Sequence, residues 1–515
     1  MKIVLISTAT FPSDQGIRTI SSVLKKAGHQ VKIVFMAYSE DYSKLYHKNE
    51  LRQLVNICRN FDLIGINCYT STAPRAIQIN NYIKKTLKKE IPIVWGGIHP
   101  TLFPEECIKY SDIVCVGEGE DAVLELTKAV EEKKSINKIR NLWIRDKATG
   151  RIIKNPIRNI IENLDKIPFA DYDVEDHFLL ENHNIRKFRE EDLGGGIFFL
   201  TGRGCPYGCE YCSNNLLNEL YKGKCKSILR WNSVDYIIEC ILFLKRKFRT
   251  LNYFDIRDDT FSFRPLSQIK EFCEKYSRKV HMRFKCLADP KTVTDEKIKL
   301  LVDAGCTDII MGIQGGEKTN FEIFKRYQKD EHTIKSAEIF NRYKGKLTVM
   351  YDIITSNPFE SPEEIINMIR LLQKLPKPYY LSVNNLVFFP GTGLYNKAVK
   401  DPSLKSIAER SKELNYWDRS KHILLKKENM YLVLILNLMR GSVTEKRFGS
   451  MPNFLINYLL KPERVKYNLN NTTFSYIVLF FMGISDLIRE RIAKPIYRSM
   501  PISFKVWYDK IRYKV

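Results

Sequence analysis

Short apolar segments alternate with amphipathic stretches along the first 155 residues, and this alternation is the feature that most constrains the fold. Five apolar segments have the length and the β-branched content of buried parallel strands, at residues 2–7, 31–37, 63–69, 91–97 and 113–117. The stretches between them show helical spacing, at residues 16–28, 42–60, 73–89 and 121–133. This order predicts a doubly wound α/β sheet, which binds its ligands at the carboxyl ends of the strands.

The ends of these predicted strands carry glycines and short polar side chains. They are Thr70 and Ser71 after the third strand, Gly96, Gly97 and His99 after the fourth, and Gly117 and Glu118 after the fifth. Glycine lets the backbone approach a flat or phosphorylated ligand, and hydroxyl groups bind at helix N-termini. No G-x-G-x-x-G follows the first strand, so a dinucleotide is not expected. Ordinary turn chemistry accounts equally well for any one of these loops.

A second series of strands and helices occupies residues 195–395. The predicted strands lie at residues 196–202, 253–257, 280–286, 309–313, 347–354 and 380–389, with amphipathic helices between them. Three cysteines, Cys205, Cys209 and Cys212, fall within eight residues in the glycine- and proline-rich loop that follows the first of these strands. Thiolate ligands in such a loop select zinc, copper(I) or an iron–sulfur cluster.

The three cysteines are compatible with two kinds of metal site, a zinc site and an iron–sulfur cluster. A structural zinc site usually closes with a fourth ligand, and the nearest candidate, Cys225, lies thirteen residues further on. A cubane cluster held by three cysteines would keep one iron open for a substrate or a cofactor. A zinc loop and a chance group of cysteines stay as alternatives.

The spacing Cys205-x3-Cys209-x-Tyr211-Cys212 resembles the signature of the radical S-adenosylmethionine enzymes. In that family, the open iron chelates the amino and carboxylate groups of S-adenosylmethionine, and the reduced cluster generates a 5′-deoxyadenosyl radical. The resemblance implies that the three cysteines hold a [4Fe-4S] cluster, with Tyr211 beside the cofactor. The six strand–helix units fit the partial (β/α)6 TIM-type barrel of the family, with its chemistry at the strand ends.

Two further strand ends extend this resemblance. Asp258 begins Asp258-Asp259-Thr260-Phe261 after the second barrel strand, although two adjacent acids also suit a solvated turn. Gln314 and Gly315 follow the fourth strand, where the family typically has Gly-x-Glu-Ser or a similar stretch, so Gln replaces the usual acid. The resemblance implies that Asp258, Gln314 and Gly315 contact S-adenosylmethionine.

Residues 94–101 and 116–120 together look like the cobalamin-binding domain found ahead of many radical S-adenosylmethionine cores. The resemblance covers about the first 135 residues and implies a Rossmann-like domain. Its cobalamin pocket would be built by Thr70, Ser71, Gly96, Gly97, His99, Gly117 and Glu118. The Asp-x-His-x-x-Gly motif is absent, because Gly28-His29-Gln30 lacks its Asp and Gly, so no histidine from that motif would reach cobalt. His99 is expected to form a wall of the pocket.

At 515 residues the chain is too long for one ordinary core. We expect a cobalamin-binding domain at 1–137, a hairpin and interdomain linker at 138–190, a radical core barrel at 191–395 and a basic, mainly helical region at 396–515. The hairpin is predicted at residues 141–155. The scattered cysteines and the lack of a signal peptide predict a cytoplasmic protein.

The net charge of +24 predicts an acidic binding partner. Much of the excess lies in residues 396–515, which contain 23 Lys and Arg but only 10 Asp and Glu. Two apolar segments there, 430–439 and 476–484, fall short of the roughly 20 residues that span a bilayer. Either they pack on the barrel, or they form a peripheral surface for an anionic membrane or a lipid-like substrate. Nucleic acid is not expected, because no recognition motif accompanies the charge.

The resemblance therefore implies a cobalamin-dependent radical S-adenosylmethionine enzyme that methylates an unactivated carbon. Its substrate would be a small molecule, lipid-like compound or natural product, and an external donor of the flavodoxin or ferredoxin type would supply electrons. One alternative is a cyclase or rearrangement enzyme with the same cofactors but no methyl transfer. Another is a non-catalytic cobalamin or redox sensor. The sequence identifies neither the substrate nor a catalytic side chain.

Overall fold

The computed structural model describes residues 1–37, 44–146, 149–193, 195–410, 429–439, 452–473 and 475. They belong to two compact units. The larger unit takes the described residues within Met1–Asp352, Leu375–Tyr380 and Val387–Asn415, and the smaller unit takes those within Ile353–Lys374, Leu381–Leu386 and Tyr416–Val515. Among the described helices, none combines the length and the hydropathy that crossing a membrane requires.

A nine-stranded sheet in the larger unit has the order β7-β6-β5-β4-β3-β1-β2-β8-β9. Its five parallel central strands are β1 (Lys2–Ser7), β2 (Gln30–Phe35), β3 (Leu63–Asn67), β4 (Ile93–Gly96) and β5 (Ile113–Cys115). Their residues are buried on both faces, as Ile3 and Val4 show at 0% exposure. This is typical of parallel strands covered by helices on both sides.

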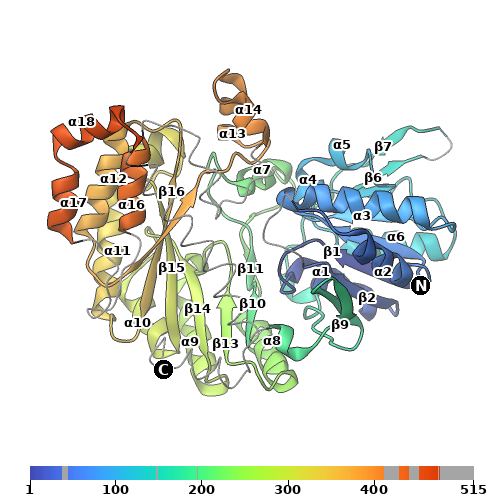
Figure 1. The fold of residues 1–515 in the computed structure, drawn as a ribbon. Coiled ribbons are helices and arrows are strands. Elements are labelled where there is room, and N and C mark those ends of the chain that lie inside the picture. Colours follow the sequence, from blue (N-terminus) through green and yellow to red (C-terminus); the bar gives the residue numbers. More distant parts are fainter. Residues whose placement is uncertain are drawn as a thin grey trace. The chain divides into compact units, whose positions relative to one another are not determined.

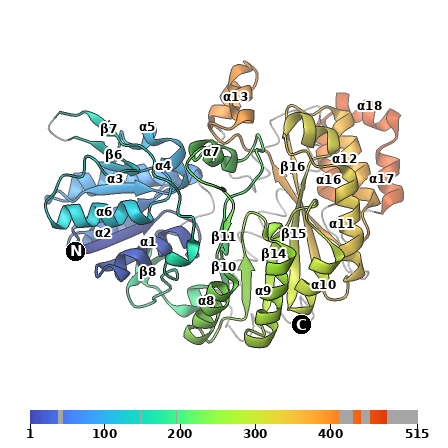
Figure 2. The same cartoon turned by 180° about the vertical axis from the view of Figure 1, so that it is seen from behind.

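Helices cover both faces of this sheet (Figures 1 and 2). On one face, α2 (Lys48–Cys58) and α3 (Ala73–Thr86) share a hydrophobic core with Trp95. On the other, α1 (Gln15–Lys26) and α6 (Glu120–Glu131) share a second core with residues of β1 and β2. Two short helices, α4 (Ile98–Leu102) and α5 (Pro104–Cys107), follow β4. The doubly wound prediction is confirmed.

The two edges of the sheet come from later parts of the chain. On one edge, β6 (Leu142–Arg145) and β7 (Ile152–Lys154) form an antiparallel hairpin beside β5. On the other, β8 (His177–Glu181) runs parallel to β2 and is followed by antiparallel β9 (Asn184–Lys187). The sequence predicted the first hairpin but only a connection at the second, because its strands are short and carry many charged residues.

A six-stranded sheet has the order β10-β13-β14-β15-β16-β17. The strands are β10 (Gly196–Phe199), β13 (Tyr253–Ile256), β14 (Arg283–Ala288), β15 (Cys306–Gln314), β16 (Thr348–Thr355) and β17 (Tyr380–Asn385). The first four pair in parallel. The helices that alternate with the strands are α8 (Val234–Lys247), α9 (Leu266–Lys279), α10 (Asp295–Asp303), α11 (Asp330–Arg342) and α12 (Pro362–Lys374). This matches the predicted six-unit strand–helix order.

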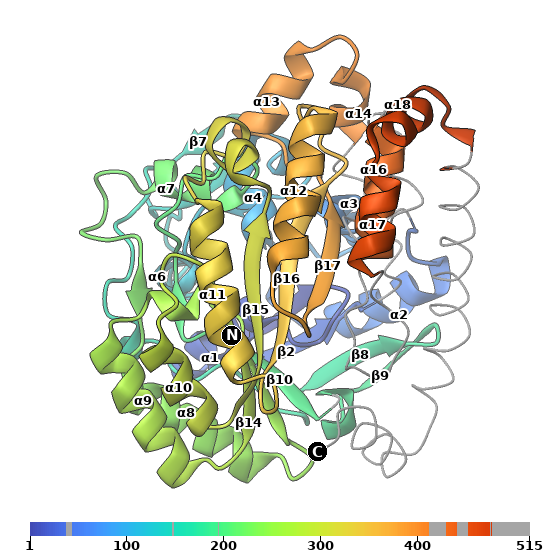
Figure 3. The same ribbon diagram turned by 90° about the vertical axis from the view of Figure 1, so that its left-hand side faces the viewer.

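The smaller unit contains α12, α16 (Met430–Leu438), α17 (Asn453–Leu459) and α18 (Pro462–Asn470). Helix α16 packs against α12, as Figure 3 shows, and seven of its nine residues are buried. The apolar segment 430–439 is therefore part of a protein core. The second apolar segment, 476–484, lies outside the described residues.

Candidate functional site

The cysteine loop is closed at its base by two short antiparallel strands, β11 (Gly202–Arg203) and β12 (Arg230–Trp231). Within the loop, α7 (Ser213–Leu220) begins directly after the last cysteine. The side-chain amide of Asn218 on α7 donates to the carbonyl oxygens of Cys205 at 3.1 Å and Tyr207 at 3.2 Å. The Glu210 N–H donates to the Phe324 carbonyl, and the Glu210 carbonyl accepts from the Leu394 N–H, both at 3.0 Å. The loop is thus fixed from three sides.

The number of thiols in the loop tests which metal it suits. A structural zinc site usually has four protein ligands. The loop contributes three free cysteines, Cys205, Cys209 and Cys212. A cubane cluster held by three cysteines keeps one iron open for a further ligand.

Burial raises the pKa of Cys205 to about 12 and that of Cys212 to about 11. Both side chains are protonated thiols at neutral pH unless a bound cation favours the thiolate, as cluster iron does. The suggested fourth ligand, Cys225, directs its sulfur at the Tyr221 carbonyl oxygen, 3.6 Å away. The donor set thus fits a cluster held by three cysteines.

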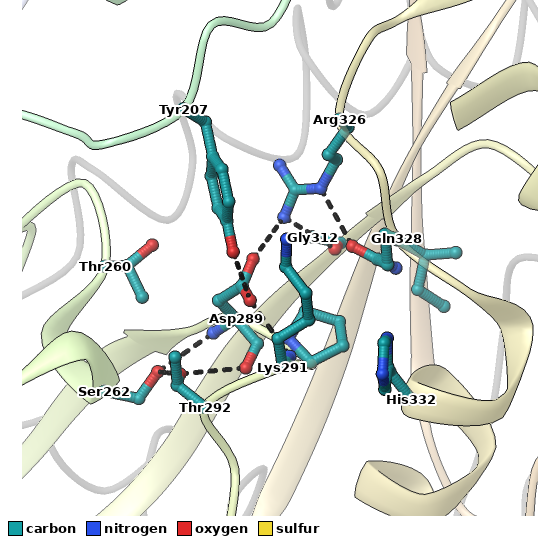
Figure 4. A network of polar contacts seen from close by, with 12 residues as sticks. Tyr207, Thr260, Ser262, Asp289, Lys291, Thr292, Gly312, Arg326, Gln328 and His332 are labelled. Carbon is teal, nitrogen blue, oxygen red and sulfur yellow. Dashed lines mark hydrogen bonds and ion pairs between the residues drawn. The ribbon is translucent and has the colours of Figure 1, made fainter. Parts of the chain in front are cut away.

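A buried ion pair lies beside the cysteine loop (Figure 4). Asp289, directly after β14, is 0% exposed and pairs with Arg326 at 2.8 Å. The hydroxyl of Tyr207, between the first two cysteines, donates to the other Asp289 oxygen at 2.9 Å. Burial raises the pKa of Tyr207, and the neighbouring Asp289 raises it further, so this hydroxyl remains a donor at neutral pH. The barrel therefore holds the cysteine loop through a buried charge pair.

Arg326 also connects the loop to the next strand end (Figure 4). It donates to the carbonyl of Gly312 at 3.3 Å, to the side-chain oxygen of Gln328 at 2.8 Å and to the hydroxyl of Tyr211 at 3.4 Å. The predicted cofactor contact Tyr211 also packs against Phe324, with ring centroids 4.9 Å apart. Tyr211 is therefore held on the barrel side of the loop.

The adjacent acids Asp258 and Asp259 lie in different environments. Asp258 is 3% exposed, and its carboxylate accepts hydrogen bonds from the backbone N–H groups of Thr201 and Gly202 and from the Thr201 hydroxyl. Asp259 lines a cavity, where the side-chain amide of Asn214 donates to it at 2.8 Å. Partial desolvation raises the pKa of Asp259, although its side chain remains accessible to solvent. Geometry therefore favours Asp259 over the predicted Asp258 as a ligand contact, because protein groups already occupy Asp258.

Gln314 and Gly315 lie where predicted, at the carboxyl end of β15. Gln314 adopts a left-handed backbone conformation with φ of 68°, and the Gly315 carbonyl accepts from the buried Asn320 side chain at 2.7 Å. Both are close to Gly312, and the guanidinium group of Arg326 donates to the Gly312 carbonyl. They belong to the barrel end around the buried ion pair and do not line the cavity of Asp259.

That cavity lies within the larger unit and has a volume of 520 Å³, within the usual size range of ligand sites. Of the predicted cobalamin contacts, Gly96, Gly97, Gly117 and Glu118 line it, whereas Thr70, Ser71 and His99 do not. From the barrel, Arg203, Asn214, Asn218, Tyr221, Arg230 and Asp259 line it. The same cavity is thus bordered by the glycine loops of the first sheet and by groups in or next to the cysteine loop.

His99 occupies a different position from the expected one. It is 2% exposed, lies in α4 and packs against Phe103 with ring centroids 5.2 Å apart. Its neighbours Ile98 and Thr101 form the cavity wall instead. A five-residue helix turns the His99 side chain into the protein, which the loop sequence alone did not indicate. No histidine is found among the described residues that line the cavity.

Two glycines form a wall that side chains could not provide. Gly97 has φ of +102°, and a Cβ there would lie 2.2 Å from the side-chain oxygen of Asn67. Gly117 has φ of +85°, and its Cβ would lie 2.3 Å from the hydroxyl of Tyr221. Both the backbone conformation and the available space exclude larger residues. A bare backbone wall of this kind fits the flat ring of cobalamin.

Charged groups from the barrel meet the last of these loops. Glu118 accepts from Arg203 at 3.1 Å, from Arg230 at 2.7 Å and from the Ile161 N–H at 3.0 Å. Burial alone would raise the pKa of Glu118, but the two arginines outweigh it and lower the pKa. Arg203 also pairs with Glu120 at 2.6 Å. The sequence placed Glu118 at the pocket but gave no sign of its arginine partners, apart from the position of Arg203 just before the first cysteine.

Family comparisons agree with both halves of the site. Residues 1–127 match the B12 binding domain, and residues 199–372 match the Radical SAM superfamily. The two matched segments contain, respectively, the glycine loops of the cavity and the cysteine loop with its ion pair.

Three curated relatives are similar over different lengths. The uncharacterized methyltransferase PH0819 of Pyrococcus horikoshii is 24% identical over 391 residues, 75% of this chain and 78% of the relative. Bacteriochlorophyllide d C-8(2)-methyltransferase of Chlorobaculum tepidum is 21% identical over 351 residues, 67% of this chain and 69% of the relative. The anaerobic magnesium-protoporphyrin IX monomethyl ester cyclase of Synechocystis is 26% identical over 200 residues, 38% of this chain and 37% of the relative.

Two solved structures share the fold. The radical S-adenosylmethionine methyltransferase TsrM from Kitasatospora setae, with cobalamin and a [4Fe-4S] cluster bound, aligns with a TM-score of 0.62 at 16% identity, covering 78% of this chain and 76% of TsrM. The cobalamin-dependent radical enzyme OxsB aligns with a TM-score of 0.62 at 16% identity, covering 95% of this chain and 75% of OxsB.

The cysteine loop, the glycine-walled cavity and the two family matches lead to one assignment. The cofactors are a [4Fe-4S] cluster, S-adenosylmethionine and cobalamin. The chain is a radical S-adenosylmethionine enzyme with a B12 binding domain ahead of its Radical SAM domain.

Proposed function

We propose that this enzyme transfers a methyl group to an unactivated carbon of a small, largely apolar molecule. The observation that carries the proposal is the shared cavity, because glycine loops suited to cobalamin and groups that hold the cysteine loop border the same space. When bound, the cluster and S-adenosylmethionine supply a carbon radical and cobalamin supplies the methyl group. Two cofactors that act on one carbon must lie close together, which a shared cavity allows.

The residues of the chain have separate tasks in this proposal. Cys205, Cys209 and Cys212 hold the cluster, and Asn218 keeps their loop in place. Asp259 offers a carboxylate for the amino group of S-adenosylmethionine, and the Asn214 amide orients it. The apolar cavity residues exclude water, which protects a radical from side reactions. Gln314, Gly315 and Tyr211 stay proposed cofactor contacts at the barrel end, and Thr70 and Ser71 stay proposed contacts of the first sheet.

The cobalamin wall consists of Gly96, Gly97 and Gly117. Since no described histidine lines the cavity, the chain would bind cobalamin without an imidazole on cobalt. Electron paramagnetic resonance of the reduced cobalt(II) form tests this, because a nitrogen ligand splits the cobalt signal. Nitrogen splitting that disappears in a histidine variant would contradict the proposed mode of binding.

The substrate class rests on the relatives. Two of the three act on flat tetrapyrrole derivatives according to their names, and the described cavity walls include Ile17, Ile20, Val94, Ile98 and Leu217. A lipid-like or polycyclic substrate would suit such surroundings. We therefore propose an apolar small molecule as substrate, and an external flavodoxin- or ferredoxin-type protein as the electron donor.

Methyl transfer and ring formation are distinguished by the fate of a labelled methyl group. The cyclase among the relatives keeps ring formation as the second candidate, although it matches only 38% of this chain. S-adenosylmethionine with a deuterated methyl group, supplied to the reduced, cobalamin-loaded enzyme with candidate substrates, should give a product that carries the intact label. A product without label would reject methyl transfer. A protein that forms no 5′-deoxyadenosine after reduction would instead be a sensor.

An anionic membrane surface is the second proposed partner of the basic C-terminal region, where the enzyme would sit peripherally. The charge of residues 396–515 supports it. Flotation of the full chain with vesicles of anionic and of neutral lipid tests the idea. Association with the anionic vesicles alone, weakened by salt, is the expected result, and equal recovery with both would reject it.

A further inference from the structure

A second group of metal-ligand side chains lies in the larger unit, apart from the cysteine loop. His47, Glu50 and His183 place three donor atoms within 4.8 Å of one another. Glu50 is on α2, and His183 lies in the turn between β8 and β9. Helix α2 and strand β9 lie side by side (Figures 1 and 3). Residues more than 130 positions apart in the chain are therefore brought together here.

The carboxylate at the centre of this group is buried in the first turn of α2, where it also caps the helix. Glu50 is 0% exposed, and its two oxygens accept from the His47 N–H and face Nδ1 of His183, each at 2.6 Å. Among the described residues, its one ion-pair partner is His183, which is charged only when protonated. A buried carboxylate is costly without an opposite charge. A bound dication would supply that charge.

The two histidines occupy backbone positions that usually favour other residues. Asn182 and His183 form the two-residue turn between β8 and β9, with φ of 47° and 66°. Such turns strongly prefer glycine at the second position. A histidine there has an unfavourable backbone conformation, which contacts of its side chain have to compensate. His47 is the N-cap of α2, where Ser, Thr, Asp or Asn is usual. The imidazole rings of His47 and His183 pack edge to face, with their centroids 4.9 Å apart.

Neighbouring contacts fix the turn in place. The side chain of Gln53, one turn further along α2, donates to the His183 carbonyl at 3.0 Å and accepts from the Ile185 N–H at 2.9 Å. The hairpin is therefore held against α2 independently of any ion. Two imidazoles and one carboxylate on rigid elements are the ligand types that zinc and similar divalent transition metals prefer.

We propose that His47, Glu50 and His183 form a binding site for one divalent transition-metal ion of the zinc class. The ion would join α2 to the β8–β9 hairpin and thereby fasten the late edge strands to the first sheet. Water would complete its coordination, since both histidines are exposed. The site is separate from the cysteine loop and does not depend on the radical reaction.

The test measures zinc bound to the full-length, cluster-loaded protein. Plasma mass spectrometry after dialysis against buffered zinc gives the metal content, and iron is measured in the same sample to show that the cluster is intact. We expect one additional zinc per chain in the natural protein and in His281→Ala, a control that removes an exposed histidine elsewhere. His47→Ala and His183→Ala should each bind zinc at least about tenfold more weakly.

Thermal unfolding separates metal binding from a fold defect. Zinc should raise the Tm of the natural protein and of His281→Ala, but leave the Tm of His47→Ala and His183→Ala unchanged, because only a ligand of the native state stabilises it. A Cys205/Cys209/Cys212→Ala triple variant should retain the zinc response. Equal zinc binding by all the histidine variants, or no zinc uptake by the natural protein, would overturn the proposal.

Discussion

The strand ends of the two sheets carry different types of residue, which suit different ligands. The first sheet presents glycines, and at Gly97 and Gly117 both the positive φ and the close neighbouring atoms disfavour a side chain. The barrel presents buried charges, with Asp289 and Arg326 paired below the cysteine loop. A flat cofactor needs a bare wall, whereas a metal loop needs rigid anchors. One region therefore works through the absence of side chains and the other through their pairing.

Substitution of a cysteine that holds the cluster should have the largest effect on cofactor content and activity. Cys209→Ala should abolish cluster assembly and 5′-deoxyadenosine formation, because a cubane cluster held by two thiolates loses a third of its protein ligands. Iron content after anaerobic reconstitution measures it. Cys225→Ala is the matched control, since its sulfur contacts a backbone carbonyl, and it should keep its iron. Full iron content and turnover in Cys209→Ala would refute the cluster assignment.

Asp289→Asn should be the most destabilising change outside the ligands. It leaves Arg326 as a buried, uncompensated charge, which costs about 3–5 kcal/mol of unfolding free energy. Urea unfolding of the cluster-free protein measures this. Asp303→Asn removes an exposed pair with Lys299 and should leave the free energy of unfolding almost unchanged. Equal losses in the two variants would show that the ion pair does not anchor the loop.

Gly97→Ala should weaken cobalamin binding about tenfold, or about 1.4 kcal/mol, because a Cβ there meets Asn67 and the Cys68 carbonyl. Gly28→Ala provides the comparison, since Gly28 has a similar φ of +88° but open space around it. Equilibrium dialysis of hydroxocobalamin against each variant measures the affinity. The same loss in both variants would mean that backbone strain, and not the shape of the wall, is responsible.

Glu118→Gln should have the smallest effect, about 1 kcal/mol at neutral pH, because the glutamine side-chain oxygen can still accept from the two arginines and Arg203 is 29% exposed. The pKa of Glu118 is below its ordinary value of 4.5, so its contribution is complete above that pH and is lost as the pH falls below it. The stability difference between the natural protein and the variant should therefore shrink below pH 4.5. Unfolding curves from pH 3 to 7 measure it, and a constant difference would contradict the pairing.

Much of the fold could be predicted from the sequence. The apolar runs that became β1–β5 are buried on both faces, so length and β-branching sufficed. The β8–β9 hairpin could not be predicted in this way, because its charged residues hide the strand pattern and its partner β2 lies some 140 positions earlier. Helix α2 begins at Lys48, within the predicted stretch 42–60.

The site was predicted less completely. The spacing of the three cysteines predicts a shared cluster, because all three lie within eight residues of one loop. Asp289 and Arg326 are 37 positions apart and only the barrel brings them together. The choice between Asp258 and Asp259 depends on which of two neighbouring side chains turns toward the cavity, and a sequence of two identical residues contains no such information.

The late edge strands of the first sheet have a consequence for how its domain could be isolated. A fragment that ended at residue 137 would lack β6 and β8, and it would leave β5 and β2 with unpaired backbone groups along both edges. Exposed strand edges recruit other chains and promote aggregation. A soluble cobalamin-binding fragment should therefore extend to about residue 193, beyond β9. The complete sheet, from β1 to β9, is longer than residues 1–127, which the family match covers.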